Sequence, residues 1–204
     1  MSHPASHPTS HPAAHPASHP AAAPLAPQVA PQPISAEVRA ALRERLAANP
    51  GIILEQLAGM NGCAVGEVIE CLPEGMWWRE SGERFIEIMH AVAAWQTPVT
   101  LITHSADAIL EFTGPLPKGE LGHGFFNLAG KTGLHGHLRH ENCAAIYYLE
   151  RPFMGKATAS LSFCNRAGSV MFKIFAGRDE SGALSVEQVA ALRELMGVKE
   201  VQPA

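Results

Sequence analysis

The stretch GLHGHLRHENC, residues 133–143, places three histidines and one cysteine within eleven residues. Imidazole and thiolate are good zinc ligands, and imidazole also serves as a general base. A closed zinc site needs four converging ligands, and H-x-H-x-x-H-x-x-C is not among the usual spacings. The spacing argues against structural zinc and leaves a polar strand face as the simplest interpretation.

Strand alternation divides this stretch into two faces. If residues 134–139 form a strand, the leucines serve the core and the basic side chains His135, His137 and Arg139 face solvent or a cleft. A second isolated histidine, His104, lies beside apolar residues in TLITHSAD. A lone histidine in such a place is more often half-buried with its ring satisfied than a ligand, so it argues only mildly against the polar strand face.

Two other motifs are better explained without a ligand. ILEQLAGMNGCAVGEVIECLP resembles a helix-turn-helix, but residues 51–78 hold four glutamates and no Lys or Arg, so they would repel nucleic acid. GKTG lacks the full phosphate-loop pattern and indicates a hairpin turn. With a net charge of −4, we expect no nucleic-acid partner.

The chain divides by composition near residue 34. Residues 1–34 contain no charged residue and carry a histidine every fourth position from His3 to His19. Such a segment has little to bury, so we predict a disordered tail that can bind Ni²⁺ or Zn²⁺ weakly. Residues 35–204 are long enough for one domain, with 35–97 mainly helical and 98–204 holding a sheet and a final helix.

The cysteines and the hydropathy indicate the compartment. Four cysteines without C-x-x-C spacing suggest reduced thiols in the cytoplasm. We find no signal peptide and no apolar run long enough to span a membrane.

Periodicity predicts an α+β fold. Helices are expected from Ser35 to Asn49, over 53–58, 64–71 and 83–95, and from Ser185, where Ser185 and Gln188 have capping-box spacing. Seven strands are expected at 99–103, 108–113, 124–128, 134–139, 144–149, 159–163 and 169–175. Short connections between them favour one large antiparallel meander.

Several long motifs in the same order resemble the cytosolic haem-utilisation carrier proteins, the ChuX/HutX family. They are the stretches ILEFTGPLPKG, HGFFNLAGKTGLHGHLRHEN, PFMG and KIFAGRDE, and the likeness extends over about residues 36–198. The resemblance implies a cytoplasmic homodimer that binds imported haem and passes it to a haem-degrading partner. It implies a fold similar to one half of the two-repeat haem-degrading proteins, and haem-associated histidines at His104 and His137.

The residues present suit haem in part. Haem needs an axial ligand, an apolar surface and cations for its propionates. We expect His137 to matter most, beside Arg139. The apolar candidates are Phe125, Phe126, Phe153 and Met154, and the other cations are Lys131, Lys173 and Arg178.

In some relatives a tyrosine that can bind haem iron stands where this chain has Phe125 and Phe126. Phenylalanine has no ligand atom, which favours histidine ligation here. Tyr147 and Tyr148 are the remaining tyrosine candidates for the iron ligand. We expect a carrier and not an enzyme. The alternatives are a haem-degrading oxygenase and a metal chaperone that works through the tail.

Overall fold

The computed structural model describes residues 31–105, 107–130 and 133–198. Three helices come first: α1 (Ala36–Ala48), α2 (Leu54–Asn61) and α3 (Val65–Ile69). Ser35 caps α1, because its hydroxyl accepts a hydrogen bond from the Val38 backbone N–H at 3.2 Å. Gly62 ends α2 with a φ of 61°, a backbone conformation that glycine adopts without strain.

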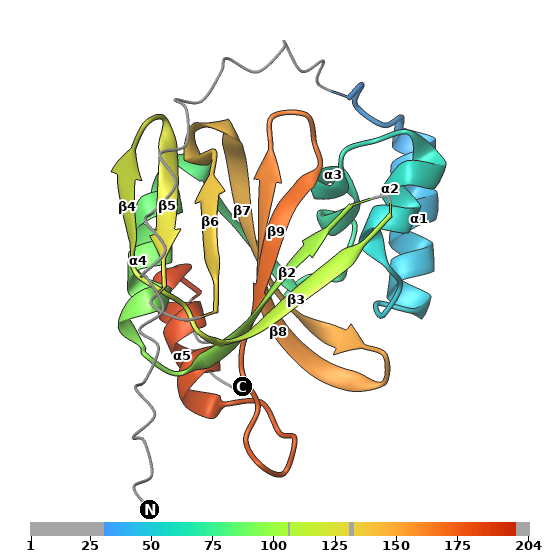
Figure 1. Ribbon diagram of the computed structural model, residues 1–204. Helices are drawn as coiled ribbons and strands as arrows, with labels where there is room; N and C mark the ends of the chain where they lie inside the picture. The colour runs from blue at the N-terminus through green and yellow to red at the C-terminus, as the bar shows by residue number, and fades with distance from the viewer. Residues whose placement is uncertain (1–30, 106, 131–132, 199–204) are drawn as a thin grey trace, which may run out of the picture.

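Within the described residues, nine strands form two antiparallel sheets (Figure 1). The larger sheet has the order β1-β7-β8-β9-β2-β3, and the smaller one has the order β4-β5-β6. The strands are β1 (Trp77–Ser81), β2 (Pro98–His104), β3 (Ile109–Pro115), β4 (Gly119–Gly122), β5 (Phe125–Ala129), β6 (His135–Leu138), β7 (Cys143–Phe153), β8 (Lys156–Asn165) and β9 (Val170–Phe175).

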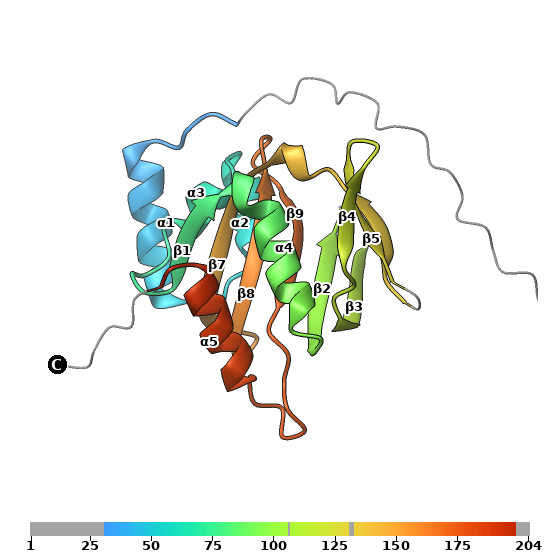
Figure 2. The same cartoon turned by 90° about the vertical axis from the view of Figure 1, so that its left-hand side faces the viewer.

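The larger sheet has a different hydrophobic cluster on each face. On one face, α4 (Phe85–Ala94), α5 (Val186–Leu195) and the inner side of the small sheet pack against Tyr148, Leu161 and Phe172. On the other face, α1–α3 pack against Tyr147, Leu149 and Cys164, which the strand alternation turns the opposite way. Figure 2 shows α4 and α5 in front of the sheet and α1 to one side. Short 3₁₀ turns at Gly82–Arg84 and His140–Asn142 complete the fold.

The predicted α+β class and the seven predicted strands are confirmed, but their arrangement is not one meander. The meander is interrupted after β3 and after β6, so β4–β6 form a sheet of their own. β9 pairs with β2, and β1 pairs with β7, with Trp78 opposite Tyr148. The mainly helical segment 35–97 therefore also supplies one edge strand of the large sheet.

The capping box at the last helix is only half formed. Ser185 accepts a hydrogen bond from the Gln188 N–H at 3.3 Å, as the spacing predicts. The Gln188 side chain turns away from the helix, accepts from Gly177 N–H at 2.7 Å and donates to Thr97 Oγ1. It joins α5 to the sheet instead of closing the cap.

Most of the predicted tail lies outside the described residues. Residues 31–34 are described, and the Ile34 N–H donates to Glu67 Oε1 at 3.1 Å while its side chain packs on the helical cluster. None of the described helices is both long enough and apolar enough to cross a membrane.

Candidate functional site

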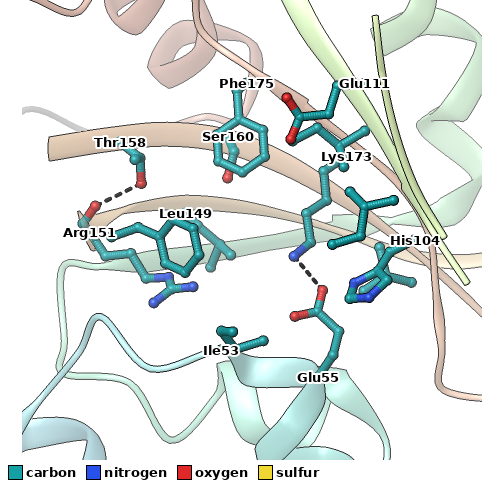
Figure 3. A pocket seen from close by; sticks show the side chains of 14 residues that line it. Ile53, Glu55, His104, Glu111, Leu149, Arg151, Thr158, Ser160, Lys173 and Phe175 are labelled. Carbon is teal, nitrogen blue, oxygen red and sulfur yellow. Dashed lines mark hydrogen bonds and ion pairs between the residues drawn. The ribbon is translucent and has the colours of Figure 1, made fainter. Parts of the chain in front are cut away.

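A groove lies on the α2 side of the large sheet, beside the area that α1–α3 cover (Figure 3). It is partly open to solvent and holds a cavity of about 150 Å³. Its walls are mostly apolar and come from Ile53, Ile102, Ile109, Leu149, Phe153 and Phe175. This apolar wall offers a surface on which a flat, largely apolar ligand could lie.

Strand register brings the polar groups of the groove to the same face. In the ladder His104 is opposite Ile109, and Ile102 is opposite both Glu111 and Lys173. Alternation then points Ile102 and His104 into the groove from β2. His104 is exposed at the end of its strand, so its imidazole is accessible to a ligand in the groove.

An ion pair crosses the groove from α2 to the sheet. The Glu55 carboxylate, in the first turn of α2, pairs with the Lys173 ammonium of β9 (Figure 3). Burial by itself would raise the pKa of the Glu55 carboxyl, but Lys173, with a smaller contribution from His104, holds that pKa below its ordinary value. Glu55 is therefore ionised at neutral pH and neutralises Lys173.

Arg151 supplies a second buried cation. It is 9% exposed, and its Nη1 donates to the carbonyl oxygens of Pro50 at 2.5 Å and Ile52 at 3.1 Å. Its guanidinium also lies 5.4 Å from the centre of the Phe153 ring. Burial lowers the pKa of Arg151, an effect that the nearby Glu55 charge opposes. The groove thus contains two cations, Lys173 and Arg151, beside the carboxylates of Glu55 and Glu111.

His137 belongs to a different surface. Its Nδ1 lies 2.6 Å from Asn127 Oδ1, and its ring centre is 5.6 Å from that of Phe125. The Arg139 guanidinium lies 5.0 Å from the centre of the same Phe125 ring. We call Phe125, His137 and Arg139 the outer patch of the small sheet, because the other side of that sheet packs in the hydrophobic cluster that also contains α4. His104, by contrast, faces α2 on the opposite side of the large sheet.

The remaining predicted residues are spread over the molecule. Phe126 is 1% exposed in the core, so Phe125 and not Phe126 presents its ring beside His137. Phe153 and Lys173 line the groove, whereas Met154 is 85% exposed and absent from its lining. Arg178 donates to the carbonyls of Gly182 and Ala157, which fixes its guanidinium at a turn. Lys131 lies outside the described residues.

The tyrosines are not placed to bind a ligand. Tyr147 and Tyr148 are buried, and their hydroxyls donate to Glu70 at 2.8 Å and Glu150 at 2.9 Å. Burial, reinforced by these carboxylates, raises the pKa of both phenols. A phenolate is therefore not accessible to the groove at neutral pH.

The opening histidine-cysteine stretch does not converge. Cys143 is buried beneath the turn, and burial raises the pKa of its thiol to about 11. Among the described residues, no group of three His, Cys, Asp or Glu side chains is placed to hold a metal ion.

Two charged residues that line the groove were missed from the sequence. Arg151 lies in β7 two residues after Leu149 and precedes a proline, and its alternation with Leu149 was the available signal. Glu55 is one of several acidic residues in the helical segment, and the sequence does not distinguish it from the others.

Comparison with known proteins identifies the family. The family model described as haem utilisation ChuX/HutX matches residues 78–195, more than half of the chain. The chain therefore belongs to the ChuX/HutX haem-utilisation family.

Individual relatives agree with this assignment. The chain is 34% identical over 151 residues to the intracellular heme transport protein HutX of Vibrio cholerae, covering 74% of this chain and 78% of HutX. A crystal structure of an Erwinia carotovora protein is 47% identical, with a TM-score of 0.72 over 76% of this chain and 96% of that one. The heme-binding protein ChuX is 41% identical, with a TM-score of 0.69 over 76% and 97% of the two chains.

The predicted likeness to half of a two-repeat protein is also confirmed at the level of fold. Apo-PhuS of Pseudomonas aeruginosa superposes with a TM-score of 0.64 at 19% identity, over 86% of this chain and 51% of PhuS. This chain thus corresponds in size and fold to about half of PhuS.

Proposed function

We propose that this protein is an intracellular haem carrier that holds haem in the groove between α2 and the large sheet, with His104 as the iron ligand. The observation that carries the proposal is the placement of His104 at an apolar groove that also contains the cations Lys173 and Arg151. Haem requires this combination of an axial ligand, an apolar wall and partners for two propionates.

The groove gives each part of haem a partner. The porphyrin ring would lie against the aliphatic and aromatic wall formed by Ile102, Ile109 and Phe153. The propionates would pair with Lys173 and Arg151, since charge-assisted hydrogen bonds to carboxylates are among the stronger polar contacts. Our proposal assigns the main ligand role to His104 instead of His137, because the apolar wall and both cations surround His104.

Carriage and not degradation is the activity we propose. HutX, at 34% identity, is named a heme transport protein, and ChuX, at 41% identity, is named a heme-binding protein. A single histidine at an open groove forms an exchangeable bond, which suits delivery to a second protein. We propose a cytoplasmic haem-degrading protein as the recipient.

A homodimer is part of the proposal. β3 is an edge strand of the large sheet, and its Ile109 and Leu110 are 57% and 68% exposed. Exposed apolar edge strands are usually covered in a native assembly. We propose that a second copy covers this region and brings its outer patch, with His137, to the mouth of the groove.

A haem titration tests the function. We expect the purified protein to shift the Soret band of ferric haem and to saturate at roughly one haem per chain. Bound haem should then pass to a haem-degrading protein, and ascorbate with oxygen should yield no biliverdin from the carrier alone. Absence of saturable binding would reject the carrier, and catalytic biliverdin formation would favour the oxygenase.

A further inference from the structure

One of the two cations in the groove, Lys173, is already paired with a carboxylate of the protein, that of Glu55. Glu55 and Lys173 are 20% and 19% exposed at their side chains, and they form the only link of opposite charges between α2 and the sheet among the described ion pairs. Figure 3 shows the Glu55 carboxylate reaching across the groove to the end of the Lys173 side chain. A ligand carboxylate that approaches Lys173 must therefore meet Glu55.

The second cation is partly engaged from the same side. Both hydrogen bonds from Arg151 to Pro50 and Ile52 run through Nη1, and both acceptors lie in the segment that leads into α2. The start of α2 is thus attached to the sheet through two cations, Arg151 and Lys173. These are the same groups that two ligand carboxylates would need.

Exchange at Lys173 need not be costly. A half-buried ion pair gains little net free energy, because its attraction must first offset the desolvation of both charges. A ligand carboxylate can replace the Glu55 carboxylate on Lys173 without leaving the ammonium unpaired. The displaced Glu55 carboxylate, whose side chain is 20% exposed, would then have to turn toward solvent.

We propose that Glu55 is an internal competitor for a haem propionate: it occupies Lys173 in the empty groove, yields Lys173 when haem binds, and returns to Lys173 as haem leaves. This inference rests on the proposed haem site and adds a release mechanism to it. Competition weakens haem binding and speeds release, which suits a protein that must deliver its cargo.

The test is the rate at which haem leaves the loaded protein, measured by capture with excess apomyoglobin. Glu55→Gln keeps the size of the side chain and removes its charge, so haem release should slow by roughly five- to tenfold. Lys173→Met should speed release, and in the Lys173→Met background the Glu55 change should have no effect. Glu67→Gln is the matched control, because it removes a carboxylate from the part-buried pair with Arg39, outside the groove.

A second ligand separates propionate competition from a general effect on α2. Haem dimethyl ester lacks the propionate charges, so Glu55→Gln should leave its release rate unchanged. If Glu55→Gln does not fold, Glu55→Ala should give the same slowing with haem and none with the ester.

Equal release rates of haem from the wild type and Glu55→Gln would overturn the inference while the haem site stands. Equal slowing with haem and with the ester would also overturn it. Failure of the wild type to bind haem would instead reject the proposed function.

Discussion

His104 and His137 show how far single residues could be interpreted from the sequence. Both were selected, and alternation placed His137 on the non-core face of its strand, as the structure has it. Alternation does not say on which side of the domain that face lies. The separation of the two histidines depends on the packing of the small sheet against α4, which is a long-range contact.

The partners of Arg151 and Glu55 could not be predicted, because they are distant in sequence. Arg151 binds carbonyls about one hundred residues earlier, with separations of 101 and 99 residues. Glu55 is distinguished from its acidic neighbours only by Lys173 across the groove. Residue type alone predicts cations for the propionates, but not which cations converge.

The two tyrosines of the chain predict its behaviour in alkali. Burial, with Glu70 and Glu150 as hydrogen-bond acceptors, raises the pKa of both phenols above the unfolded value of about 10. Their contribution to stability is therefore complete below about pH 10 and is lost as the pH rises above it. We expect tyrosinate absorbance to appear together with loss of the circular dichroism of the fold. Reversible tyrosinate formation near pH 10 in a protein that stays folded would contradict the burial described here.

At the scale of elements, the strands missed by the sequence analysis are those with a mixed pattern. β1, with the sequence WWRES, lies among helices and has no apolar alternation beyond its tryptophans. β4, with the sequence GELG, begins and ends with glycine, which is a poor strand former. Both are defined by their partners: β1 pairs with β7, and β4 pairs with β5. The periodicity of the sequence therefore predicted the strands that have a hydrophobic face of their own, and it missed β1 and β4.

Two glycines test how closely the elements approach each other. A Cβ added to Gly82 would lie 2.1 Å from the carbonyl oxygen of Cys143, where the 3₁₀ turn after β1 meets the start of β7. We expect Gly82→Ala to lower the free energy of unfolding by about 2–4 kcal/mol in urea denaturation. Gly59→Ala in α2 meets nothing within 4 Å and should raise it by about 0.5–1 kcal/mol. Similar stabilities for the two variants would show that the turn and β7 are farther apart.

At the scale of the whole molecule, the separation of the two histidines makes assembly testable. Sedimentation at micromolar concentration should show a dimer. The outer patch of one copy should complete the groove of the other, so a mixture of His104→Ala and His137→Ala chains, refolded together, should contain heterodimers with one intact site. We expect haem affinity in the mixture to exceed that of either variant alone.

The contrary result is equally clear. If the mixture binds haem no better than the average of the separate variants, the site is not shared between two copies. Either both histidines of a site then come from the same chain, or His137 takes no part in binding haem. A monomer under all conditions would remove the second copy from the site.

The most direct measurement is the visible spectrum and affinity of the haem complex of His104→Ala beside those of the wild type. His90→Ala serves as the control, since His90 lies on α4 and bonds the Gly119 carbonyl at 2.9 Å, on the other side of the sheet. We predict that His104→Ala shifts the Soret band and weakens haem binding by at least about tenfold, the cost of losing about 1.4 kcal/mol of ligand bond. His90→Ala should keep the wild-type spectrum. A wild-type spectrum and affinity in His104→Ala would contradict the assignment of the groove as the haem site.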